Sequence, residues 1–220
     1  TVYLVSETLS NLSAEITDWL NSQIVHVPSS DIKKVTVKKR GAEPFTLAMG
    51  EDDTLEMKDL GENHEMDTTE TYDLQSALSY FRFDDIADPS MAEESMGLDN
   101  PSVFTVLTKD GIVYNVTVGS VVSEEDPSRY IRLEASLAQN EQQSGNAKEK
   151  PEDESSEPNT EENPADKIKS LNRQTEGWTY IVAEHKIESM LKNREELIKA
   201  KETQDEDQDE EASGQDGKGS

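Results

Sequence analysis

The sequence of 220 residues contains no cysteine, so disulfide bonds and thiol chemistry are both excluded. It also contains no run of about twenty apolar residues, the length that a transmembrane helix needs. The chain begins with Thr1 rather than methionine and opens directly on the strand-like letters TVYLV. We therefore expect a fragment without a membrane-spanning segment of its own, and any signal or anchor would lie upstream of it.

Motifs that organise catalysis are also missing. There is no G-x-S-x-G elbow, no glycine-rich phosphate loop and no dinucleotide fingerprint. The histidines His26, His64 and His185 are far apart in the sequence, and none has a second ligand at metal-binding spacing. Glu62-x-His64-Glu65 lies in a polar stretch and lacks the helical spacing of a zinc motif. We therefore predict no enzyme activity, no catalytic residue, no cofactor and no metal site.

Negative charge dominates the composition, since 48 acidic and 21 basic residues give a formal net charge of -27. Residues 139–167 carry nine acids against three bases, and residues 202–220 carry eight against one, with almost no apolar side chains in either stretch. Such segments cannot offset roughly 1–2 kcal/mol of backbone entropy per residue, so we predict both to be disordered. The net charge also argues against nucleic acid and anionic membrane surfaces as partners.

The best-defined structural signal is the stretch from Gly97 to Gly119. Apolar residues alternate on both sides of Asp110-Gly111, and Asp-Gly between two alternating runs is the strongest short-range hairpin signal. We predict a hairpin with a two-residue type I′ turn, in which both central residues have positive φ. A further run over 130–133 is predicted to pair with this hairpin.

Shorter runs before the hairpin complete the predicted fold. Alternating residues over 32–37, 45–49 and 55–57 indicate a small antiparallel meander. Asp67 with Glu70 resembles a capping box, and an apolar stripe from Leu74 to Phe81 indicates a helix. The prediction is an α+β fold: antiparallel sheets, formed by a meander plus a hairpin, with amphipathic helices packed on one face.

The two ends of the compact region share one pattern. Trp178, Tyr180 and Val182 alternate as a predicted strand, and apolar residues over 187–198 form a predicted amphipathic helix. Residues 3–7 match residues 180–184, and residues 9–20 match that helix after a one-residue shift, which indicates an internal repeat. The predicted organisation is as follows: 1–27, closing strand-helix of a preceding repeat unit; 28–138, main α+β unit; 139–167, disordered acidic insertion; 168–201, closing strand-helix of the main unit; 202–220, disordered acidic tail.

Four stretches resemble, in order, the bacterial domain-of-unknown-function family 4340 (DUF4340): WLNSQIVHVPSSDIKKVTVKKRGAEPFTL, LQSALSYFRFDDIADPS, MGLDNPSVFTVLTKDGIVYNVTVG and GWTYIVAEHKIESMLKNREEL. The most specific features are the Gly97-Leu98-Asp99-x-Pro101 turn, with Asp110-Gly111 and Gly119 after it, and then the Trp178-x-Tyr180 strand. The resemblance implies an N-terminal membrane anchor, repeated α+β units outside the cytoplasm and genes beside gliding-motility-type ABC transporters. It implies no activity and no catalytic residues. The acidic insertion, the acidic tail and Met96, where an aromatic residue is common, depart from the family pattern.

Two functions from different classes are compatible with these features. The first is a non-catalytic extracytoplasmic binding or scaffold module, an accessory component of a gliding-motility-type ABC transport system with protein partners in the membrane. The second is a glycan- or peptide-binding domain at the cell surface, with Trp19 or Trp178 as an exposed platform. Because both tryptophans belong to the repeated apolar pattern, we expect them to be buried, which favours the first function. A tryptophan in a cleft would favour the second.

Overall fold

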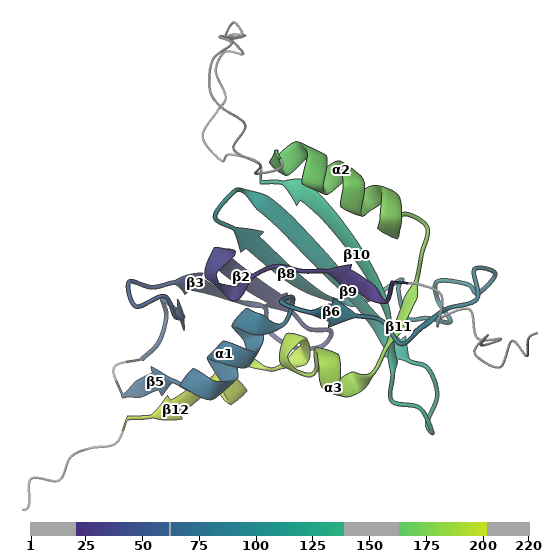
Figure 1. Cartoon of the computed structure of the whole chain (residues 1–220). Helices are drawn as coiled ribbons and strands as arrows, with labels where there is room; N and C mark the ends of the chain where they lie inside the picture. The colour runs from purple at the N-terminus through teal and green to yellow at the C-terminus, as the bar shows by residue number, and fades with distance from the viewer. Residues whose placement is uncertain (1–20, 62, 139–162, 202–220) are drawn as a thin grey trace, which may run out of the picture.

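The computed structural model describes residues 21–61, 63–138 and 163–201 of the chain (Figure 1). Predictions on residues 1–20, 139–162 and 202–220 lie outside the described residues, and these include the opening strand-helix, its repeat relationship and Trp19. The strands are β1 (Gln23–Val25), β2 (Ile32–Lys38), β3 (Phe45–Met49), β4 (Leu55–Glu56), β5 (His64–Met66), β6 (Phe81–Arg82), β7 (Asp85–Ile86), β8 (Ser102–Thr108), β9 (Ile112–Val121), β10 (Arg129–Leu137), β11 (Tyr180–Val182) and β12 (Ile198–Ala200). The helices are α1 (Thr68–Ser76), α2 (Pro164–Thr175) and α3 (Glu184–Ile187), with 3-10 turns η2 (Ser29–Asp31), η3 (Ser189–Leu191) and η4 (Arg194–Leu197).

One eight-stranded sheet organises the described part of the chain. Its strand order is β4-β3-β2-β8-β9-β10-β11-β7, and every neighbouring pair is antiparallel. Two short ribbons, β1-β6 and β12-β5, accompany it. The predicted α+β class is confirmed, and so are the meander of β2, β3 and β4 and the pairing of β10 with the hairpin.

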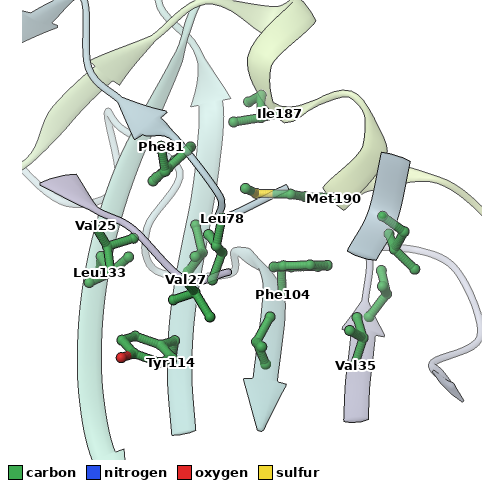
Figure 2. Packing of buried hydrophobic residues seen from close by; sticks show 14 of the residues in the cluster. Val25, Val27, Val35, Leu78, Phe81, Phe104, Tyr114, Leu133, Ile187 and Met190 are labelled. Carbon is green, nitrogen blue, oxygen red and sulfur yellow. The ribbon is translucent and has the colours of Figure 1, made fainter. Parts of the chain in front are cut away.

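The sheet buries one face, and its other face is covered only in part, where Tyr130 of β10 packs with Met96 and Leu98 of the loop before β8. Phe104 and Val106 of β8 are buried, whereas their neighbours Val103 and Thr105 are only partly covered, as period-two alternation requires. Figure 2 shows Phe104, Tyr114 and Leu133 of the sheet facing residues of the β1-β6 ribbon and the α3-η3 segment. Ile168 and Leu171 of α2 pack against the same cluster. The helices therefore cover one face, as predicted.

The hairpin turn differs from the prediction. Gly111 has φ 83°, but Asp110 is not among the residues with positive φ, and the Gly111 amide donates to the Thr108 carbonyl at 3.1 Å. This is a type I turn followed by a left-handed glycine, the usual three-residue hairpin loop. The Thr108 hydroxyl donates to the Ile112 carbonyl and accepts from the Ile112 amide, at 2.9 and 3.0 Å. These bonds hold the strand ends together, so a type I′ turn is not needed.

Gly119 marks a close approach between the hairpin and the loop before it. The Ser120 amide donates to the Met96 carbonyl at 2.8 Å, and a Cβ placed on Gly119 would lie 2.2 Å from that oxygen. No other residue fits there without a backbone shift. Gly97 has φ 66°, and a Cβ on it would meet the Ser120 amide nitrogen at 2.8 Å. These contacts explain why the Gly97–Gly119 stretch carries glycine at both ends.

Helix α1 begins as predicted and ends earlier. The Asp67 carboxylate accepts hydrogen bonds from the amides of Thr69 and Glu70, at 3.0 and 3.3 Å, and so caps the helix. The helix stops at Ser76, and Phe81 reaches the core from β6 instead. The apolar spacing identified the buried residues correctly, although only part of the segment is helical.

The predicted helix over 187–198 is wrong. That segment is divided between α3, η3, η4 and β12, because Lys192 is extended and a new capping box starts at Asn193. Ile198 then pairs with Met66 in β5. Ile187, Met190 and Leu197 are nevertheless fully buried. Strand pairing with a distant segment has overridden the local helical periodicity.

The predicted insertion over 139–167 ends too late. Helix α2 begins at Pro164, and the Asn163 side chain caps it by accepting from the Ala165 amide at 3.1 Å. The helix is anchored by Asn172, whose side-chain amide both donates to and accepts from the backbone of Ala135 in β10, each at 2.8 Å. The Asn163 cap and the contact of Asn172 with β10 therefore stabilise a first helical turn over 164–167, which composition alone assigned to the acidic insertion.

Candidate binding sites

The described part of the chain contains a groove of about 1000 Å³ that we call the histidine groove. It lies between α1, the β1-β6 ribbon and the α3-η3 segment. These elements are assembled by long-range pairing: β1 pairs with β6, and the α3-η3 segment packs against α1. Its lining includes His26, Tyr72, Tyr80, Arg82, His185 and Lys192.

Two exposed tyrosines form walls of this groove. Tyr72 on α1 and Tyr80 after it are 63% and 73% exposed. The ring of His26 lies against Tyr80 with centroids 4.9 Å apart and donates from Nδ1 to the Ser79 carbonyl. Large aromatic side chains held at the surface by such contacts suit recognition of a partner rather than core packing.

Basic side chains gather at the groove despite the acidic composition of the chain. The Lys192 ammonium pairs with the Glu70 carboxylate and so joins η3 to α1. The Lys186 ammonium pairs with Asp84 at 2.5 Å, and the same carboxylate accepts from the Ala183 amide at 2.8 Å. Arg82 and His185 complete the basic lining, against Asp73 and Glu188. The groove therefore offers aromatic and cationic groups together.

The groove brings together two histidines that the sequence keeps apart. His26 and His185 both line it, whereas His64 lies on β5 and lines a different cavity. Across the described ranges, no serine hydroxyl is hydrogen-bonded to a histidine ring, and no cluster of three potential ligands could hold a metal ion. No linear motif could have revealed the groove, because β1-β6 pairing creates it.

A second cavity, of about 300 Å³, lies where α2 meets β11, and we call it the tryptophan pocket. Phe83 and Tyr180 form its floor, with ring centroids 5.1 Å apart and planes inclined by 29°. Both are buried, and burial raises the pKa of the Tyr180 phenol. The lining residues are Asn21, Gln23, Ile24, Phe83, Ile86, Gln174, Thr175, Trp178 and Tyr180.

The burial predicted for Trp178 is wrong. Its side chain is 46% exposed. The chain leaves α2 through Gly177, whose φ of 79° suits glycine, and the Trp178 amide donates to the Thr175 carbonyl at 3.1 Å. Trp178 therefore precedes β11 and stands at the mouth of the pocket instead of inside the sheet-helix interface. The same prediction for Trp19 concerns a residue outside the described ranges.

A third groove, of about 800 Å³, runs beside α1 on the side of β4 and β5. Leu55, Met57 and Met66 supply its apolar surface, and Lys109 and Lys201 stand at it. Tyr72 borders both this groove and the histidine groove. The described residues thus place a second groove beside α1, next to the histidine groove.

These features describe an antiparallel α+β domain with several surface cavities. Residues 1–101 match the family described as Domain of unknown function (DUF4340), which supports the resemblance of the sequence to that family. The match ends at Pro101, so the hairpin and the Trp178-x-Tyr180 strand lie beyond it. No curated protein and no solved structure matches the chain. Within the described residues, no helix is both long and apolar enough to cross a bilayer.

Proposed function

We propose that this chain is a non-catalytic binding module that engages a protein partner through the histidine groove. The observation that carries the proposal is the grouping of exposed Tyr72 and Tyr80 with Arg82, His185 and Lys192 in one large groove. Exposed tyrosine and arginine side chains are the types that dominate binding energy at protein interfaces.

One cationic side chain of the groove supports an acidic partner segment. The chain as a whole is strongly negative, so the Arg82 guanidinium at the groove is a local exception that would attract an approaching anionic group. Lys192 and Lys186 already have carboxylate partners, whereas Arg82 has no ion-pair partner among the described residues. We expect Arg82 to contribute most to recognition of an acidic segment.

The family resemblance supplies the proposed setting. Proteins of this kind resemble membrane-anchored, extracytoplasmic components encoded beside gliding-motility-type ABC transporters. We propose the same location for this chain, on the periplasmic side and held by a segment outside it. The partner would then be a permease or ATPase subunit of the transport system, or a protein attached to it.

Site-directed photocrosslinking would test this proposal. A photoreactive benzoylphenylalanine at Tyr80, in the full-length protein in native membranes, should capture a transport subunit. The matched control is the same probe at Leu137, which is 54% exposed on β10 and does not line the histidine groove. Adding Arg82→Glu should reduce capture at Tyr80. Equal capture from both positions, or no transport subunit at Tyr80, would refute the proposal.

A second candidate function is ligand binding at the cell surface. One observation favours it: Trp178 is half-exposed at a pocket, which is the arrangement expected of a glycan or peptide platform. This candidate concerns a different surface from the histidine groove, so the two functions can be tested separately.

A further inference from the structure

We propose that the tryptophan pocket binds an uncharged sugar unit, such as the end of a neutral glycan. The inference rests on the second candidate function above and names its ligand class. It is independent of the histidine groove, with which the pocket shares no lining residue.

The first step of the argument is the absence of charge. In this chain 31% of residues are charged, yet none of the nine described residues that line the pocket is an acid, a lysine or an arginine. A phosphate, a uronic acid or an acidic peptide would find no counter-charge there. A cation would find no carboxylate.

The second step is the aromatic surface. Trp178 presents an exposed ring at the mouth, above a floor in which Phe83 and Tyr180 are stacked. One face of a pyranose ring carries axial C–H groups and is apolar. Such a face packs on a rigid indole ring, which loses little conformational entropy on binding.

The third step is the type of polar group at the rim. Asn21, Gln23 and Gln174 each carry a primary amide, which donates and accepts hydrogen bonds from adjacent atoms. Neighbouring sugar hydroxyls also donate and accept, so an amide matches a pair of them without an ionic group. The Asn21 side-chain oxygen accepts a hydrogen bond from the backbone amide of Gln23 at 3.1 Å. This bond fixes the orientation of the Asn21 side chain and leaves its NH₂ group available to a ligand.

The fourth step is the rigidity of the walls. The Phe83 amide donates to the Ser22 carbonyl at 3.0 Å, which fastens the pocket floor to the segment that carries Asn21 and Gln23. Asn172 fastens α2, and with it Gln174, to β10. A cavity of about 300 Å³ between such supports is at the small end of ligand sites and suits one sugar unit better than a folded partner.

Saturation-transfer NMR on the full chain would test the inference, with calorimetry for any ligand that responds. The probes are glucose, galactose, N-acetylglucosamine and their disaccharides, with glucuronic acid and Gly-Ala-Gly as charged and peptide comparisons. At least one neutral sugar should bind, and Trp178→Ala should weaken it by about tenfold or more. Trp178→Phe should retain part of the affinity, because it keeps an aromatic face.

Two further variants make the result specific. Gln174→Glu adds a charge without changing size and should weaken the neutral sugar. Tyr72→Ala, outside the pocket, should leave it unchanged, and circular dichroism would verify the fold of each variant. Failure of every neutral sugar, equal binding of glucuronic acid or the peptide, or full binding by Trp178→Ala would overturn the inference. None of these outcomes bears on crosslinking at Tyr80, so the two proposals fail independently.

Discussion

The histidine groove and the tryptophan pocket are built on the same short segment but have opposite chemistry. Phe81 and Arg82 line the groove, and Phe83 and Ile86 line the pocket. The groove adds basic and tyrosine side chains from α1 and α3, whereas the pocket adds amides and a tryptophan from α2 and the residues around β1. The elements that pack beside a segment, rather than the segment itself, therefore decide what each surface can recognise.

The largest effect should come from the core beneath the groove. Phe81 is 2% exposed, whereas its neighbour Tyr80 is 73% exposed. Phe81→Ala should lower the free energy of unfolding by about 3–5 kcal/mol, because it removes a buried ring. Tyr80→Ala should change it by less than about 0.5 kcal/mol. Urea denaturation would measure both, and similar losses would show that Tyr80 is a structural residue.

The next effect should separate the two sites through α2. Asn172→Ala removes two hydrogen bonds to Ala135 and should cost roughly 1–3 kcal/mol. It should weaken sugar binding in the tryptophan pocket and leave crosslinking in the histidine groove unchanged, since α2 lines only the former. Lys169→Ala, on an exposed position of the same helix, is the control. An equal loss of sugar binding and of crosslinking in Asn172→Ala would contradict the idea that α2 supports only the tryptophan pocket.

A smaller effect should come from the ion pair between Lys192 and Glu70. Lys192→Met keeps most of the apolar stem but leaves the largely covered Glu70 carboxylate without its cation, so it should cost about 1–2 kcal/mol. The cost should shrink near about 1 M salt, where charges are screened within about 3 Å. Gln174→Ala, in the uncharged pocket, should show no salt dependence. A Lys192→Met cost that is independent of salt would show that packing, not charge, holds the groove wall.

The smallest effect at neutral pH should come from Tyr180→Phe. Burial raises the pKa of Tyr180 above its unfolded value of about 10. The folded state then holds the proton more tightly, so the stabilisation is complete below pH 10 and is lost as pH rises through the folded pKa. Denaturation between about pH 8 and 11 should show a shallower decline for Tyr180→Phe. The pKa of Tyr114 is also raised, first by burial and then by the negative charges of Asp110 and Asp31. Some decline of stability with rising pH should therefore remain in Tyr180→Phe.

The strands were predictable because one face of the sheet is buried. Period-two alternation located β2, β3, β8, β9 and β10, since a strand with one covered face must alternate. The turn type was not predictable from Asp110-Gly111 alone, because Thr108 supplies hydrogen bonds that stabilise a longer loop. The buried residues near the C-terminus were predictable, but their secondary structure depends on β12 pairing with β5.

The sites were less predictable than the strands. Pairing of β1 with β6 brings His26 into a groove with His185, and no local pattern encodes that contact. Trp178 satisfied the apolar alternation of a strand, yet Gly177 and the turn after α2 place it at the surface. Alternation reports which residues suit a covered face, not whether a strand has already begun.

The position of β11 has a consequence for how the protein is made. It lies between β10 and β7 in the sheet. Strand β7 (Asp85 and Ile86) can therefore pair only after Tyr180 and Ile181 of β11 have been synthesised. During translation the edges of β10 and β7 that pair with β11 therefore stay unpaired until nearly the whole described chain has emerged. Chaperones that bind nascent chains should be needed longest at these two strand edges.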